Sequence, residues 1–175
     1  MKRILTAAVV FMSVGALHAA NDSAREILQA TGVRGGLVVH LGCGDGKLTA
    51  ALRANDSYLV HGLDTDAKNV SKAREHIRAK GFYGKVSVNT FDGKSLPYAD
   101  NMVNLLAASR LGSVSMTEVL RVLTPNGVAY VSKDGAWKKT VKPRPAEMGQ
   151  WSHHLHEADG NPVTADRIVG PPRRM

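Results

Sequence analysis

The sequence predicts an α/β fold in which a parallel sheet lies between two layers of helices, a three-layer α/β/α sandwich. Three observations lead to this prediction. From residue 21 onward, short apolar runs alternate with amphipathic helical patterns. A glycine-rich segment joins the first such run to the helix that follows it. The length of 175 residues and the hydrophobic content of 43% suit one domain with a core, and exclude a disordered chain.

The first 20 residues have the pattern of a secretory signal peptide. Lys2 and Arg3 precede a run of uncharged residues from Ile4 to Leu17, which is too short to cross a bilayer as a helix. Alanine occupies the position before the expected cleavage point, but the third position before that point holds Leu17 or His18 and not the small residue preferred there. We therefore expect a periplasmic or secreted protein with a suboptimal cleavage site and no stable membrane insertion after cleavage.

The first half of the domain is predicted from four runs. Residues 37–41 are apolar except for His40 and give the first strand, and residues 46–54 give a short helix. Residues 58–63 form the second strand, and residues 67–80 have a helical period that Gly81 ends. Each strand is thus followed by a helix, which is the pattern of parallel strand pairs joined by crossover helices.

The second half continues the alternation. Residues 86–91 alternate as a third strand, and residues 102–108 are almost continuously apolar, as in a buried fourth strand. Residues 115–123 read as a helix, and the turn at residues 125–127 leads into a fifth strand at 128–131. We expect the spatial order 3-2-1-4-5, with the ligand at the carboxyl ends of the strands where that order reverses.

Beyond residue 135 the sequence shows no clear helical or strand period. Five of the seven prolines fall between residues 136 and 175. We therefore predict a domain over residues 21–135 and a proline-bearing extended tail or linker over residues 136–175.

A nucleoside site is predicted where the first strand meets its helix. The loop consists of Gly42, Cys43, Gly44, Asp45 and Gly46. Glycines there let a ligand approach bare backbone, and the start of the next helix favours a carboxylate or phosphate. An acid at the end of the second strand, Asp64, lies 18 residues after the last loop glycine, where it can accept both hydroxyls of a ribose. Lys47 stands where a dinucleotide fingerprint needs its third glycine, which disfavours NAD.

These blocks resemble the class I S-adenosylmethionine-dependent methyltransferases of the small-molecule type. The resemblance implies a Rossmann-like fold and S-adenosylmethionine as the cofactor. It also implies that the loop backbone from Gly42 to Gly46 lies against the methionine part of the cofactor and that Asp64 binds the ribose. By the same resemblance Asp92 lies beside the adenine amino group and Phe91 lines the adenine pocket. The segment from Glu118 to Gly127 resembles the family's element leading into the fifth strand.

Two departures from the family pattern bear on activity. The family often has an acid at the start of the fourth strand, where this chain has Asn104. The family's sheet also ends in an antiparallel hairpin that usually helps to form the acceptor pocket, and this hairpin is expected to be missing here. The expected function is methyl transfer to an unknown small-molecule acceptor. The alternatives are a catalytically inactive methyltransferase-like binding or scaffolding domain of an exported multidomain protein, and a nicotinamide-binding domain.

Other candidate sites are weaker. No catalytic residue is assigned, because methyl transfer requires mainly positioning of the acceptor. A tail cluster of His153, His154 and His156 contains metal-ligand types but no second ligand group at a recognised spacing, so no metal site is predicted. The charge of +8 falls on patches without interleaved aromatics, which predicts no nucleic-acid partner. The last 25 or so residues resemble a junction to a C-terminal quinoprotein-type β-propeller in a longer chain.

Overall fold

A computed structural model of the protein describes residues 19–133, 135–149 and 154. Most of the predicted signal peptide and most of the tail, including His153 and His156, lie outside these residues. The described residues up to Lys142 belong to one compact unit, which contains the whole sheet. No helix among the described residues is both long and apolar enough to cross a membrane.

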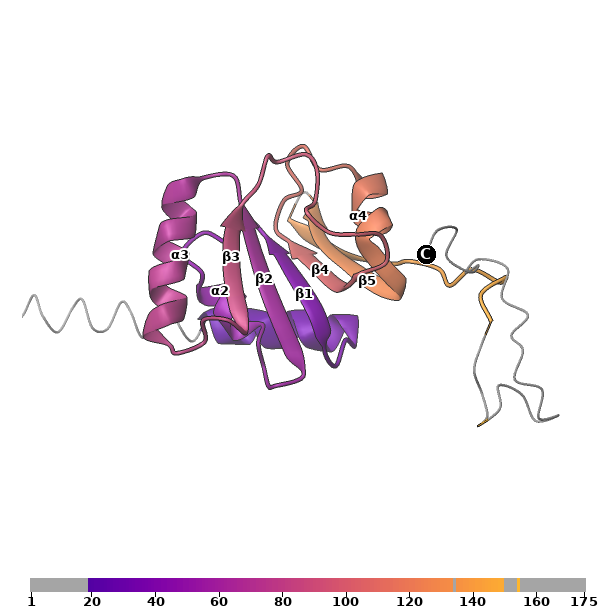
Figure 1. The fold of residues 1–175 in the computed structure, drawn as a ribbon, viewed down its shortest axis with the longest axis horizontal. Coiled ribbons are helices and arrows are strands. Elements are labelled where there is room, and N and C mark those ends of the chain that lie inside the picture. The colour runs from indigo at the N-terminus through magenta and orange to yellow at the C-terminus, as the bar shows by residue number, and fades with distance from the viewer. Residues whose placement is uncertain (1–18, 134, 150–153, 155–175) are drawn as a thin grey trace, which may run out of the picture. The chain divides into compact units, whose positions relative to one another are not determined.

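Six strands form one sheet in the order β3-β2-β1-β4-β5-β6. The first five are parallel and lie side by side in Figure 1, which confirms the predicted order 3-2-1-4-5. Their bounds are β1 Gly36–Leu41, β2 Tyr58–Asp64, β3 Val86–Thr90, β4 Val103–Ala108, β5 Leu123–Lys133 and β6 Ala136–Val141. The helices are α2 Lys47–Ala51, α3 Ala67–Ala79 and α4 Met116–Val122.

The expectation that no antiparallel strand follows the fifth is wrong. β6 pairs antiparallel with β5, from Val128 opposite Val141 to Lys133 opposite Ala136. β6 escaped the hydrophobic pattern because most of its residues are exposed at the edge of the sheet. A hairpin signal was nevertheless present, since Asp-Gly is a preferred two-residue turn and Gly135 follows Asp134 with a φ of 83°.

Alternating strand residues supply two separate cores, one on each face of the sheet. Val38 faces α2, α3 and an N-terminal helix over residues 19–31, whereas its neighbour Val39 faces α4. The N-terminal helix was not predicted, although Ala24 and Ile27 follow a helical spacing and are 2% and 3% exposed. Helices thus cover both faces, as the predicted three-layer sandwich requires.

β5 is longer than predicted because it begins before the turn-forming residues. Its pairing with β4 shifts register between Val103 and Leu105, and Asn126 has a positive φ of 64°. Lys142 closes this irregular part, since its N–H donates to the Gly127 carbonyl at 2.9 Å and its carbonyl accepts from the Asn126 N–H at 2.9 Å. Pro125 has no backbone N–H to donate, and it lies in this irregular part of the pairing, where a strand can lack one hydrogen-bond donor.

Candidate functional site

The carboxyl ends of β1 and β4 lie next to each other where the strand order reverses. β1 pairs with β2 on one side and with β4 on the other, so the loops that follow β1 and β4 diverge from this point. Such a reversal leaves a crevice between the loops, where open parallel sheets bind ligands. A pocket of about 380 Å³ lies here. It is lined by Leu41, Gly42, Asp64, Thr65, Phe91, Asp92, Gly93, Arg110, Leu111, Gly112 and Ser113.

The glycine loop after β1 has a backbone that only glycine adopts easily. Gly42, Gly44 and Gly46 all have positive φ, at 75°, 51° and 79°. A Cβ at Gly46 would lie 2.8 Å from the Cα of Ala73 on α3, so the loop passes too close to α3 for a side chain. A Cβ at Gly42 would meet nothing within 4 Å, which leaves the pocket wall there as bare backbone.

Asp64, at the end of β2, holds the glycine loop against its own strand. Its Oδ2 accepts the Gly44 N–H at 3.1 Å, and its Oδ1 accepts the Asp66 N–H at 2.9 Å. The side-chain amide of Asn69 approaches both oxygens at 3.4 and 3.3 Å. The residue is only 7% exposed, yet it lines the pocket. A carboxylate has about four acceptor positions, and the two backbone N–H groups and the Asn69 amide already contact all four, so ligand hydroxyls would take the place of the two long contacts from Asn69.

Phe91 and Asp92 follow β3 and form the facing wall of the same pocket. The Phe91 N–H donates to the Asp64 carbonyl at 3.1 Å, which ties this wall to β2. Asp92 Oδ1 accepts the N–H groups of Lys94 and Ser95, both at 2.8 Å. These bonds lower the pKa of Asp92, so its exposed carboxylate is charged at neutral pH.

The structure thus brings together four of the eight residues predicted for the cofactor, namely Gly42, Asp64, Phe91 and Asp92. The other four belong to the loop but do not line the pocket. Burial, reinforced by the neighbouring Asp64 charge, raises the pKa of the Cys43 thiol to about 12, so it is un-ionised at neutral pH. Asp45 caps the Lys47 N–H at 3.1 Å, while Gly44 and Gly46 shape the loop.

The loop after β4 was not predicted to line the site. Arg110, Leu111, Gly112 and Ser113 come directly after that strand and form the third wall of the pocket. Their place after a buried strand at the reversal of strand order was the available signal, because loops at this edge of a parallel sheet build the ligand site. Within the described residues, no group of three or more His, Cys, Asp or Glu side chains could hold a metal ion.

A second, larger pocket of about 770 Å³ adjoins the first through the shared residues Arg110, Leu111 and Gly112. It lies between the start of α4 and the β5–β6 hairpin. The described lining consists of Ser109, Arg110, Leu111, Gly112, Met116, Val131, Ser132, Gly135, Lys138 and Thr140. The hairpin that was expected to be absent therefore contributes directly to this pocket.

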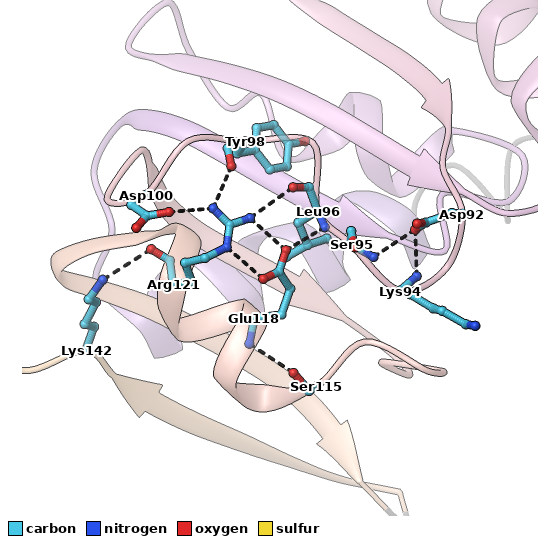
Figure 2. Close-up of polar contacts among 10 residues, drawn as sticks. All are labelled: Asp92, Lys94, Ser95, Leu96, Tyr98, Asp100, Ser115, Glu118, Arg121 and Lys142. Carbon is cyan, nitrogen blue, oxygen red and sulfur yellow. Dashed lines mark hydrogen bonds and ion pairs between the residues drawn. The ribbon is translucent and has the colours of Figure 1, made fainter.

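Arg121 on α4 fixes the segment that follows Asp92 (Figure 2). Its guanidinium forms two bonds of 2.7 Å to the Glu118 carboxylate and one of 2.6 Å to Asp100. It also donates to the carbonyls of Tyr98 at 2.9 Å and Leu96 at 3.2 Å. Hydrogen bonds from Arg121 lower the pKa of Glu118 to about 2, and Glu118 accepts the Leu96 N–H at 2.8 Å. Glu118 and Arg121 thus anchor the loop that carries Asp92.

Asn104, which stands where the family often has an acid, has a structural role. Its Oδ1 accepts the Leu37 N–H at 2.9 Å. A Cβ on Gly36 would lie 2.1 Å from the same Oδ1, so the amide fills the space that this glycine leaves. The uncharged side chain therefore joins β4 to β1 at the edge opposite the pocket.

Comparison with known proteins agrees with the fold. A family model described as a methyltransferase domain matches residues 38–127. Methyltransferase GfsG from Streptomyces halstedii is 31% identical over 96 residues, which are 51% of this chain and 34% of that protein. The chain thus spans about a third of the length of this curated relative.

Solved structures share the fold. The [4+2]-cyclase SpnF is 27% identical with a TM-score of 0.59, over 65% of this chain and 44% of its own. An S-adenosylmethionine-dependent methyltransferase from Aquifex aeolicus is 20% identical with a TM-score of 0.56, over 65% of this chain and 68% of its own. With the family model covering the glycine loop, Asp64, Asp92 and the turn after α4, the chain belongs to the class I S-adenosylmethionine-dependent methyltransferase family.

Proposed function

We propose that this chain is a methyltransferase that binds S-adenosylmethionine in the smaller pocket and a small-molecule acceptor in the larger one. The observation that carries the proposal is the meeting of Gly42, Asp64, Phe91 and Asp92 in one pocket at the reversal of strand order. The volume of about 380 Å³ falls within the usual range for small-molecule sites.

The chain's own residues fit this cofactor. Asp64 offers a nearly buried carboxylate for two ribose hydroxyls, and charge-assisted hydrogen bonds of this kind are among the stronger ones. Phe91 supplies an apolar wall for the adenine ring, and Asp92 an acceptor for its amino group. The bare backbone at Gly42 lets the methionine part approach closely. When bound, S-adenosylmethionine supplies an activated methyl group on its sulfonium.

The chain positions the acceptor and does not activate the methyl group. The two pockets share Arg110, Leu111 and Gly112, so an acceptor in the larger pocket lies beside the cofactor site. The described lining of the larger pocket contains no Asp, Glu or His. We therefore assign no general base among these residues, and orientation and exclusion of water are the catalytic contribution of the pocket.

Calorimetric titration of the full 175-residue chain tests the proposal. S-adenosylmethionine and S-adenosylhomocysteine should both bind, and NAD should not. Asp64→Asn should weaken binding by about tenfold or more, because it removes the charge that strengthens the ribose hydrogen bonds. Asp22→Asn, at an exposed acid of the N-terminal helix, is the matched control and should bind normally. A folded chain that binds NAD, or binds neither sulfur ligand, would refute the assignment.

A catalytically inactive methyltransferase-like binding domain is the second candidate. SpnF shares this fold and is a [4+2]-cyclase, so the fold alone does not fix methyl transfer as the activity. The inactive domain predicts the same binding without formation of S-adenosylhomocysteine from S-adenosylmethionine in the presence of an acceptor. Mass spectrometry of the products separates the two candidates, since methyl transfer adds one methyl mass to the acceptor.

We also propose that the protein is exported, on the strength of Lys2, Arg3 and the uncharged run behind them. Fractionation of cells that produce the chain should find a processed form outside the cytoplasm. Recovery of only the unprocessed chain in the cytoplasm would contradict export.

A further inference from the structure

The larger pocket has two cations on its wall from different parts of the fold. Arg110 lies in the loop after β4, and Lys138 lies on β6. Lys138 is the register partner of Val131, and Thr140 is the partner of Ala129; both of these β5 residues belong to the core on the α4 side. Because side chains alternate along a strand, Lys138 and Thr140 face α4 while Lys139 faces the other side.

Neighbouring basic residues are occupied by internal acceptors, in contrast to these two. Lys139 donates to the carbonyls of Ala30 and Thr31 at 3.1 and 2.8 Å. Lys142 donates to three oxygens, including the Leu123 carbonyl at 2.8 Å. Within the part of the chain that the structure describes, neither Arg110 nor Lys138 has a hydrogen-bond or ion-pair partner. The described lining of the pocket thus has two positive charges and no negative one.

The rest of the pocket wall is largely apolar, with a few hydroxyls. Leu111, Met116 and Val131 contribute hydrocarbon or thioether surface, and Met116 is 37% exposed at the start of α4. Ser109, Ser132 and Thr140 add hydroxyl groups. A ligand that complements this wall needs an anionic group for the cations and an apolar body for the remaining surface.

We propose that the larger pocket binds an organic carboxylate with an apolar body, held by Arg110 and Lys138. The positive charge and the apolar surface of the pocket are sufficient reason for this binding, whether or not the bound molecule is methylated. Arg110 lines both pockets, so a carboxylate bound to it lies beside the cofactor site. That this carboxylate is the methyl acceptor rests on the proposed function.

Octanoate, octanamide and octylamine are suitable probes, since they share an apolar chain and differ in the charge of the head group. Calorimetry with the full chain should give at least about tenfold tighter binding of octanoate than of octanamide, and the weakest binding for octylamine. Arg110→Gln and Lys138→Gln should each weaken octanoate binding about tenfold. Lys72→Gln removes the same charge from an exposed position on α3 and should leave octanoate binding unchanged.

The location of binding is tested by nuclear magnetic resonance. Octanoate should shift the backbone amide signals of Gly112 and Gly135, which line the pocket, more than those of Gly81 and Gly84. Equal binding of octanoate and octanamide, no octanoate binding, or an equal loss in the Lys72 variant would overturn the proposal.

The same titrations with S-adenosylhomocysteine keep the two proposals separate. If S-adenosylhomocysteine binds but octanoate does not, the carboxylate site is refuted and the cofactor site stands. If octanoate binds with the predicted variant pattern and S-adenosylhomocysteine does not, the carboxylate site stands and the methyltransferase function fails.

Discussion

Asp92 combines a structural and a proposed ligand-binding role in one carboxylate. Its Oδ1 accepts the N–H groups of Lys94 and Ser95, so the loop shape depends on an acceptor atom at this position. An asparagine keeps one such oxygen, whereas an alanine has none. The two substitutions therefore separate the shape of the loop from its charge.

We expect Asp92→Ala to weaken S-adenosylhomocysteine binding by about tenfold, because the loop loses two backbone hydrogen bonds and the adenine loses its acceptor. Asp92→Asn should lose less, since its side-chain oxygen still caps the loop. Calorimetric titration of both variants checks this order. Equal affinity of the alanine variant and the unaltered chain would exclude Asp92 from the site.

His40 makes stability depend on pH. It is 4% exposed, its Nδ1 lies 2.8 Å from the Thr49 hydroxyl, and burial lowers its pKa from 6.5 to about 4 against the opposing effect of Asp64. A lowered pKa in the folded state means that the neutral ring is favoured by folding. The resulting stability is present above pH 6.5 and is lost as the pH falls toward 4. His61 and His76 have pKa values lowered by burial as well, so they act in the same direction.

Urea unfolding at pH 7.5 and pH 4.5 should show a fall in the free energy of unfolding, of which His40 contributes roughly 2–3 kcal/mol. In His40→Gln this part of the fall should disappear. His76→Gln is the matched control and should remove less, because His76 is only partly buried. A fall of the same size in the unaltered chain and in His40→Gln would contradict a buried neutral ring at this position.

At the scale of elements, α4 holds the loop between β3 and β4. Arg121 and Glu118 bind three successive parts of that loop at Leu96, Tyr98 and Asp100 (Figure 2). The guanidinium serves this geometry because its donors are fixed in a plane and reach several acceptors at once. The loop is therefore ordered before a ligand arrives, which lowers the entropy cost of binding.

We predict that Arg121→Gln increases the rate of amide hydrogen exchange in residues 94–100 and weakens S-adenosylhomocysteine binding by roughly threefold to tenfold. Arg121→Lys keeps the charge but not the planar fork, and should restore little of either property. Arg25→Gln, at an exposed ion pair on the N-terminal helix, should change neither. Normal exchange in residues 94–100 of Arg121→Gln would show that α4 does not position this loop.

The strands differ in how far the sequence predicts them. β1, β2 and β4 were predictable because buried parallel strands have mostly apolar runs, such as Leu37 to Leu41, in which His40 is the one polar residue. β6 has no apolar period, because a strand at the edge of a sheet is exposed, so only the Asp-Gly turn before it indicates a strand here. Lys138 therefore fell within the predicted extended tail, although it lines the larger pocket.

In the candidate site, too, residues fixed by the local strand-helix-strand unit were predictable, and residues brought in by tertiary pairing were harder to predict. Gly42 and Asp64 were predictable because the tight turn and the ribose each demand one residue type at a fixed place in the strand-helix-strand unit. The position of Arg110 after β4 could have placed it at the smaller pocket, but its place in the larger pocket depends on β6 pairing with β5. Contacts set by tertiary pairing have no local pattern in the sequence.

At the scale of the whole molecule, the order of strands decides where a ligand binds. The chain builds β1 to β3 outward in one direction, then returns to place β4 and β5 on the other side of β1 (Figure 1). This reversal brings the loops after β1, β2, β3 and β4 to one edge of the sheet, where both pockets lie. At the amino ends of the strands the chain instead has tight structural contacts, such as that between Gly36 and Asn104.

The central claim is that S-adenosylmethionine binds at this carboxyl edge. The most direct measurement is the change in backbone amide signals of the full chain on titration with S-adenosylhomocysteine, observed by nuclear magnetic resonance. We predict the largest shifts at Gly42, Gly93 and Gly112, which line the smaller pocket from three different loops. Shifts confined to glycines away from the pocket, such as Gly81 and Gly84, or no shifts in a folded chain, would contradict the claim.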